Sequence, residues 1–563
     1  MKEKMFKYIL SLIMFVILFG CSNENSYDLT ETSEILITSE AGDKMTITDN
    51  VTFINGHAES GIILNVNPDS IKQTIDGIGT SFTESSAFVL AHLDTVKRSE
   101  VMKNIFGKAG ADFTLTRTHI GSCDFTVEGK YSYDDEKGDT DLSSFDISCD
   151  SKGFSKKEYP GIKDESYDLM PMIKEALKIK SEQNGELRII SSAWTAPYWM
   201  KDIEEWYIPG SPKNSWQGTG GSLKPEYESV YADYIIRYIK EYQKEGVNIW
   251  GITPVNEPYG NNGQWESMNF TPESQNEFIK DHLGPKMKES GYSDVKLLIY
   301  DQNRDGIEHW TNVLFNDKET AQYIYGIAVH WYESTNKVYE DVFDSVKEKF
   351  PQFSIIHTEG CIDDLGKDAP EGVSDPEGYK DENWFNNDEF WWGKNATDWA
   401  YTVPWQGVKV EDHPAYVPVH RYARNIIVSI DHWLQGWIDW NIVLDKNGGP
   451  NHVGNFCGAP IMIDTDKQFV YYTPIYDILS QFSRTIRPGD QAVQTSLELD
   501  GIDKDTIYAC ATLNSERVLS VQMLNTGSKL INYKLQIGDQ CADISIKANS
   551  VQTVRVKLAK KGN

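Results

Sequence analysis

Two glutamates in this sequence follow short apolar segments. Glu257 comes three residues after the segment 248–254, and Glu359 ends the segment 354–359. A charged side chain after an apolar run costs desolvation energy unless the charge is paired or used. Either glutamate alone could pair with a cation or cap a helix, but two of them suggest hydrolysis of a glycosidic bond. In that reaction one carboxylate protonates the leaving oxygen, and the other attacks the anomeric carbon or activates water.

The glutamates belong to a repeating pattern of strands and helices. Helical periodicity is clearest at 169–180, 227–244 and 338–350. Strands that alternate with helices form parallel units, and eight such units close a TIM barrel, whose active site lies at the carboxyl ends of the strands. The fourth and seventh strands would therefore bring Glu257 and Glu359 to one face. The eight apolar, β-branched runs are 74–82, 113–120, 187–194, 248–254, 295–301, 324–330, 354–359 and 436–440.

The two ends of the chain have a different pattern. Short alternating runs separated by Gly, Asn and Asp fill residues 492–558, and similar runs occur at 35–54 and 61–66. This pattern is typical of an antiparallel β-sandwich. We therefore predict an α/β protein, a (β/α)8 TIM barrel with a side β-sandwich domain formed from both termini. The predicted divisions are 1–20 (signal peptide), 21–35 (tether), 36–70 (N-terminal strands), 71–485 (barrel) and 486–563 (C-terminal strands).

The first residues predict export. Three lysines precede the apolar segment 8–20, and residues 18–21 read Leu-Phe-Gly-Cys. This pattern resembles a bacterial lipoprotein signal with Cys21 as the lipidated residue; simple secretion is the alternative. We expect a lipid-anchored protein at the bacterial outer membrane, on its periplasmic or cell-surface face. No later run approaches eighteen apolar residues, so no transmembrane helix is expected.

The composition excludes several classes of protein. The 563 residues carry a formal net charge of −30, which makes nucleic acid an unfavourable partner. The 16 Trp and 29 Tyr residues suggest stacking surfaces. The sequence has no GxSxG, HExxH, GxGxxG or zinc-type cysteine spacing, so we predict no metal and no cofactor. His357 and Glu359 match the H-x-E of zinc deaminases, but no P-C-x-x-C follows.

The chain resembles glycoside hydrolase family 30, especially its glucosylceramidase and endo-β-1,6-glucanase branches. The resemblance implies a TIM barrel with a side β-sandwich and a retaining mechanism, in which Glu257 is the acid/base and Glu359 the nucleophile. The substrate would be a β-linked glycan or glycoside. The matching motifs occur in order at 76–84, 117 with 122–125, 194–197, 253–258, 327–332, 358–361, 436–441 and 448–456.

The same resemblance implies a set of substrate-binding residues. Carboxylates and amides can satisfy several sugar hydroxyls, and Trp rings pack on the apolar side of a pyranose. Arg117 is expected to keep Glu359 ionised, because an adjacent cation lowers the pKa of a carboxylate. The residues assigned to the substrate are Asp124, Trp194, Asn256, Trp440 and Asn455, with His330, Trp331 and Tyr332 on a neighbouring strand.

The segment 363–415 is longer than the resemblance leads us to expect. It holds five Trp residues and could form extra sugar subsites, a lid, or a small core of its own. Two alternatives to a β-glucosidase remain at this point. One is a surface lipoprotein that binds glycans without cleaving them, although such a protein would need neither glutamate. The other is an enzyme of the same family that acts on another sugar such as xylose or fucose. The linkage, exo or endo action and the oligomeric state stay open.

Overall fold

The computed structural model describes residues 27, 29–334, 336–362, 384–393 and 417–559. The predicted signal peptide, Cys21, and most of the segment 363–415 lie outside the described residues. Within the described residues, no helix is long and apolar enough to cross a membrane.

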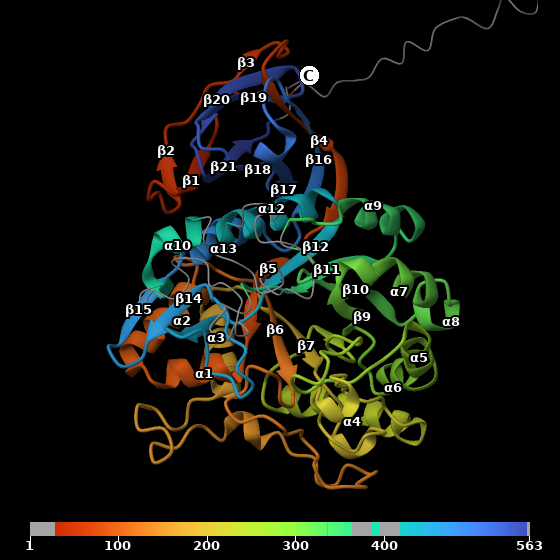
Figure 1. Ribbon diagram of the computed structural model, residues 1–563. Coiled ribbons are helices and arrows are strands. Elements are labelled where there is room, and N and C mark those ends of the chain that lie inside the picture. Colours follow the sequence, from red (N-terminus) through yellow and green to blue (C-terminus); the bar gives the residue numbers. More distant parts are fainter. Residues whose placement is uncertain (1–26, 28, 335, 363–383, 394–416, 560–563) are drawn as a thin grey trace, which may run out of the picture.

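The predicted barrel is confirmed (Figure 1). Its eight parallel strands close in the order β10-β11-β12-β5-β6-β7-β8-β9. Six of them each contribute one apolar residue, from Leu115 to Ile438, to a separate buried cluster. The strands are β5 (Gly77–Phe82), β6 (Leu115–Ile120), β7 (Arg188–Ala193), β8 (Gly251–Thr253), β9 (Lys296–Asn303), β10 (Ile324–His330), β11 (Ser354–Glu359) and β12 (Leu434–Asp439).

Helices surround the barrel, and the three predicted ones occur within a few residues of their expected limits. Helix α4 shows how the sequence fixes the strands: Tyr231 donates to the carbonyl of Pro254 at 2.6 Å, and Tyr238 to Ser191 at 3.0 Å. The helix thereby holds the ends of β7 and β8. The helices are α1 (Glu84–Ala91), α2 (Thr95–Phe106), α3 (Leu169–Glu182), α4 (Glu228–Lys244), α5 (Pro272–Phe278), α6 (Gly284–Glu289), α7 (Ile307–Leu314), α8 (Lys318–Ala321), α9 (Glu340–Lys349), α10 (Asp388–Trp392), α12 (Pro418–Asp431) and α13 (Pro474–Thr485).

The two ends of the chain form a separate sheet-rich domain, as predicted. Its ten described strands make one hydrogen-bonded sheet in the order β2-β1-β21-β18-β17-β16-β4-β19-β20-β3. The sheet folds over its own apolar core, since Tyr533 of β19 donates to Gln552 of β21 at 2.9 Å. The strands are β1 (Glu34–Ser39), β2 (Thr46–Thr48), β3 (Ile54–Asn55), β4 (Ile62–Thr74), β16 (Gln491–Glu498), β17 (Ile507–Leu513), β18 (Val518–Asn525), β19 (Ile531–Ile537), β20 (Gln540–Ile546) and β21 (Ser550–Lys557).

Strand β4 links the two domains. It lies between β16 and β19 in the terminal sheet and ends at Thr74, three residues before β5 begins the barrel. Helices α12 and α13 lie between the terminal sheet and the barrel (Figure 1). A small sheet of β13 (Val443–Asp445), β14 (Ile461–Asp464) and β15 (Phe469–Tyr472) follows β12, and the chain between β13 and β14 passes over the barrel's active-site end. The exact domain limits stay predictions.

Candidate active site

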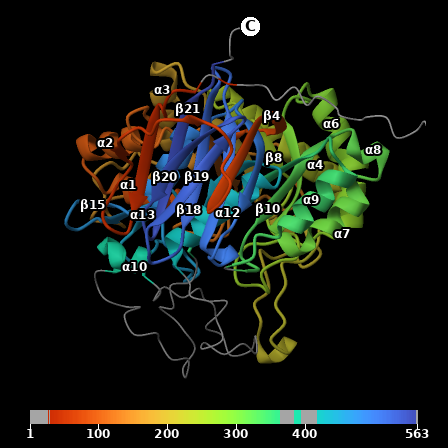
Figure 2. The same ribbon diagram turned by 90° about the horizontal axis from the view of Figure 1, so that it is seen from above.

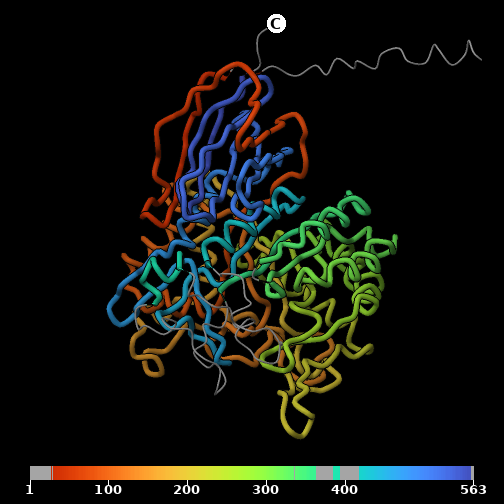
Figure 3. Tube along the Cα trace, turned by 45° about the horizontal axis from the view of Figure 1, so that its top comes forward, coloured from red at the N-terminus to blue at the C-terminus, as the bar shows by residue number. Residues whose placement is uncertain are grey.

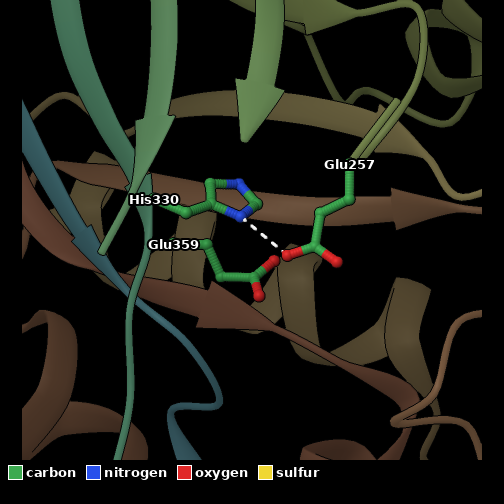
Figure 4. A group of neighbouring side chains, drawn as sticks. All are labelled: Glu257, His330 and Glu359. Atoms are coloured by element: carbon green, nitrogen blue, oxygen red, sulfur yellow. Dashed lines mark hydrogen bonds and ion pairs between the residues drawn. The ribbon is translucent and has the colours of Figure 1, made fainter. Parts of the chain in front are cut away.

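The two glutamates meet at the carboxyl ends of the barrel strands. Glu359 is the last residue of β11, and Glu257 lies four residues after β8. Their side chains point toward one another with His330 beside them (Figure 4). One oxygen of each carboxylate and one nitrogen of His330 lie within 4.8 Å of one another. Glu257 adopts the left-handed backbone conformation, with φ of 50°, which a non-glycine residue holds only when its surroundings enforce it.

A buried arginine connects the carboxylates. Arg117 on β6 has no exposed surface and donates to Glu359. Its second terminal nitrogen donates to Asp301 and to Asn256, each at 2.7 Å. A buried guanidinium is stable only where carboxylates and hydrogen-bond acceptors surround it. Arg117 therefore fixes both the nucleophile candidate and the amide beside Glu257.

Asp301 at the end of β9 is the centre of this network, and the sequence analysis did not identify it. It accepts hydrogen bonds from Thr358 at 2.6 Å and Thr253 at 2.8 Å, and His330 Nε2 lies 3.1 Å away. Burial opposes the charge of Asp301, but Arg117 and His330 hold its pKa well below the usual range. Like Glu359, Asp301 is a carboxylate at the end of an apolar run, which is the signal that could have revealed it.

The charges of the site balance one another. Burial disfavours the imidazolium form of His330, yet Glu359, Asp301 and Glu257 raise its pKa to about 9. Burial raises the pKa of Glu359, and the charges of His330 and Arg117 oppose that rise. Arg117 thus acts in the direction predicted from the sequence, but it does not outweigh desolvation. The positive Arg117 and His330 match the negative Asp301 and Glu359.

A cavity of about 1180 Å³ opens over the two glutamates. Trp194 and Trp440 lie stacked in its wall, with ring centroids 5.3 Å apart. Asn455 donates to one oxygen of Asp124 at 3.1 Å, while the other oxygen is buried without a hydrogen-bond partner among the described residues. Burial and the charge of Glu359 raise the pKa of Asp124 to about 8. An unsatisfied buried oxygen is well suited to a sugar hydroxyl.

Comparison with known proteins identifies the family. The model of the Glycosyl hydrolase family 30 TIM-barrel domain matches residues 75–375 and 404–486. The chain belongs to glycoside hydrolase family 30. Family 30 enzymes are glycoside hydrolases, and the substrate of this one is accordingly a β-glycoside.

Two curated relatives and one solved structure illustrate the similarity. The lysosomal acid glucosylceramidase of Mus musculus is 27% identical, over 84% of this chain and 78% of that protein. The endo-1,6-beta-D-glucanase of Neurospora crassa is 25% identical, over 75% of this chain and 72% of that protein. The crystal structure of SrfJ from Salmonella typhimurium has the same fold, with a TM-score of 0.74 and 22% identity over 93% of this chain and 99% of SrfJ.

Most of the residues predicted for the substrate line the cavity of this family 30 enzyme, and two do not. Tyr332 donates to Glu359 at 3.0 Å, while His330 is fully buried, with its Nδ1 3.2 Å from Glu257. Trp331 is fully buried, and its ring packs against the guanidinium of Arg421 at 4.0 Å. Neighbouring residues leave a strand on opposite sides. The residues that line the cavity are Asp124, Trp194, Asn256, Tyr332, Trp440 and Asn455.

A second buried pair holds the loop that carries Asn455. Glu266 is fully buried, accepts from Ser122 at 2.9 Å and lies 3.0 Å from His452 Nε2. The Glu266 carboxylate helps to raise the pKa of His452. The pair joins the loops after β6, β8 and β13. No sequence pattern marked Glu266, and His452 stood only within the matching motif 448–456 without a role, because the two lie in loops that meet only when the barrel closes.

Glu257, His330 and Glu359 also form a cluster, among the described residues, whose ligand atoms could reach one metal ion. Arg117 already donates to Glu359 there, and the carboxylates hold His330 in its charged form. Two positive groups at this place oppose a bound cation. We therefore interpret the cluster as acid–base machinery.

Proposed function

We propose that the protein is a retaining β-glycosidase that hydrolyses β-glucosidic bonds by double displacement, with Glu359 as nucleophile and Glu257 as acid/base. The carboxylate separation carries this proposal. Retaining enzymes place their carboxyl groups about 5–5.5 Å apart, whereas inverting enzymes leave about 6.5–9.5 Å for a water molecule. Oxygens of Glu257 and Glu359 within 4.8 Å of one another favour direct attack.

In the first step a Glu359 oxygen attacks the anomeric carbon while Glu257 gives its proton to the leaving oxygen. In the second step Glu257 takes a proton from water, which attacks the same carbon and releases Glu359. Arg117 and Tyr332 each hold one oxygen of Glu359 before attack. Because Arg117 donates to the Asn256 oxygen, the NH₂ group of Asn256 stays available for the sugar's 2-hydroxyl.

The roles of the two glutamates can be separated with azide. The variant Glu257→Ala should keep much of its first-step rate with 2,4-dinitrophenyl β-glucoside, because dinitrophenolate leaves without a proton. Its second step should be slow, and azide, which needs no base, should restore turnover and give a β-glucosyl azide. An α-glucosyl azide from Glu257→Ala, identified by NMR, would reverse the assignment.

We also propose that Cys21 carries a lipid that anchors the enzyme at the outer membrane. The basic residues, the apolar segment and the Leu-Phe-Gly-Cys motif support this proposal. Labelled palmitate should enter the wild-type protein but not Cys21→Ser, and that variant should move to the soluble fraction. Labelling of Cys21→Ser at the wild-type level would contradict the anchor.

A further inference from the structure

Residues 201–223, which we call the arm, leave the barrel between β7 and α4. Bridges between Lys201 and Leu223 and between Ile208 and Thr219 join its two segments. A single 3-10 turn, Pro212–Asn214, forms its tip. Figures 2 and 3 show the arm as a yellow loop that projects from the body of the protein. Part of the arm lines the catalytic cavity.

Buried hydrogen bonds hold the base of the arm. The Lys201 side chain, which is fully buried, donates to the carbonyls of Trp206 at 2.6 Å, Gly220 at 2.9 Å and Ser267 at 3.0 Å. Three oxygens around one ammonium satisfy all three of its donors. The arm is thereby tied to the loop that follows Glu257.

Close backbone contacts join the outer part of the arm to the same loop. A Cβ at Gly218 would lie 1.8 Å from the carbonyl oxygen of Asn262, and one at Gly263 would lie 2.1 Å from that of Ile208. Only glycine fits at such distances. Asn262 also accepts from the Gly218 N–H at 2.9 Å. The arm and the loop therefore form one unit.

This unit carries an aromatic side chain that is largely exposed at the wall of the cavity. Trp216 lines the cavity although 67% of its surface is exposed, and Tyr207 and Trp265 line the cavity with it. An exposed aromatic side chain at the wall of a binding cavity, with two further aromatic side chains beside it, is available to contact a ligand. A flat indole suits the apolar face of a pyranose ring.

The surrounding side chains favour a sugar over a lipid. Amides have donors and acceptors that match sugar hydroxyls, and a hydrocarbon chain would desolvate those amide groups that have no partner in the protein. The amides that line this part of the cavity are Asn256, Asn261, Asn262, Gln264, Gln302 and Asn303.

The position of the unit identifies the part of the substrate that it binds. Glu257, as proton donor, must lie at the leaving oxygen, and Asn262, which contacts the arm, lies five residues farther along the same loop. We propose that Trp216, together with Tyr207, binds a sugar of the leaving group, so that the enzyme acts on an oligosaccharide or glucan and not on glucosylceramide. This inference rests on the proposed function, since it takes Glu257 as the proton donor.

The test compares two substrates that differ in the leaving group. β-Glucosyl fluoride has no sugar there, whereas a panel of β-1,6- and β-1,3-linked gluco-oligosaccharides does. In Trp216→Ala the ratio of kcat/KM for the best oligosaccharide to that for the fluoride should fall about 3- to 10-fold, as for the loss of an aromatic contact. Trp216→Phe, which keeps a ring, should recover part of that ratio.

The control is Phe469→Ala, which removes another exposed aromatic side chain, 43% exposed, on β15. It should leave the ratio unchanged. An unchanged ratio in Trp216→Ala would overturn the proposal. A larger loss on glucosylceramide micelles than on oligosaccharides, or a wild-type enzyme that cleaves glucosylceramide and no oligosaccharide, would overturn it in favour of a lipid leaving group.

Failure of this inference differs from failure of the proposed function. If the proposed function fails, Glu359→Gln will keep its activity on β-glucosyl fluoride, or Glu257→Ala will give an α-glucosyl azide, whatever Trp216→Ala does. If only the inference fails, Glu359→Gln will lose that activity and Glu257→Ala will give the β-glucosyl azide, while the Trp216 ratio stays at the wild-type value.

Discussion

The ion pair in the inner part of the catalytic site and the ion pair at the base of the arm differ in their burial. Arg117 and Asp301 are wholly buried and joined at 2.7 Å, whereas Lys137 and Glu204 pair at the base of the arm with 59% and 42% of their side chains exposed. Buried charges must be matched because water cannot replace a lost partner, while exposed ones exchange partners with solvent. We therefore expect changes of charge to cost more stability in the inner site than in the arm.

The largest effect should come from the nucleophile. Glu359→Gln keeps the size of the side chain but cannot attack the anomeric carbon, so turnover should fall by about four orders of magnitude or more for every leaving group. Steady-state kinetics with β-glucosyl fluoride and with oligosaccharides would measure the fall. The surface variant Glu308→Gln is the control and should match the wild type. Residual Glu359→Gln activity above one hundredth of wild type would contradict the assignment.

The next effect concerns stability. Asp301→Asn removes the negative charge of one carboxylate between Arg117 and His330. The two buried cations then lose part of the negative charge that neutralises them. The free energy of unfolding should fall by about 3–5 kcal/mol, the usual cost of breaking a buried ion pair. Urea denaturation followed by circular dichroism would measure it. A loss under 1 kcal/mol would show that the inner site does not depend on matched charge.

Because of His330, the free energy of unfolding should depend on pH in the alkaline range. Its folded-state pKa of about 9 lies above its unfolded value of 6.5, so its contribution is complete below pH 6.5 and is lost as pH rises through 9. The difference between these two pKa values corresponds to about 3 kcal/mol of unfolding free energy. The difference in unfolding free energy between wild type and His330→Gln should shrink by that amount between pH 6 and 10. His432→Gln, at the end of α12, should follow the wild type; a constant difference for His330→Gln would contradict the prediction.

The smallest effect should come from the arm's own ion pairs. Glu204→Gln breaks the contacts with Lys137, which is exposed, and with Lys224, which is partly buried. We expect the midpoint of urea unfolding to stay within experimental error, since exposed pairs contribute little. A shift as large as that of Asp301→Asn would remove the contrast between the two regions.

The sequence predicted the barrel strands and both glutamates because these depend on local pattern. A buried parallel strand is a short apolar run, and a charge at its carboxyl end stands out against that run. Glu257 and Glu359 were predicted on this ground and from the family resemblance. The same ground would have revealed Asp301, which ends the predicted run 295–301.

The remaining features depend on contacts between distant segments. Asp301 lies where the pairing register of β9 and β10 shifts by one residue, and such bulges redirect side chains. The pairing of Glu266 with His452 and the fit of Gly218 against Asn262 join loops that are far apart in sequence. Trp331, just after β10, is fully buried, although its neighbours His330 and Tyr332 reach the two glutamates. These contacts between distant segments cannot be predicted from the local pattern along the chain.

The central claim is that Glu359 forms a covalent bond to the sugar, and one measurement tests it directly. Incubation with 2,4-dinitrophenyl 2-deoxy-2-fluoro-β-glucoside should trap the glycosyl-enzyme, because fluorine at carbon 2 destabilises the oxocarbenium-like transition state of its hydrolysis. Peptide mass spectrometry should then find one 2-fluoroglucosyl group on the peptide that contains Glu359. A label on Glu257, or dinitrophenol release with no labelled peptide and an α-configured product, would contradict the account.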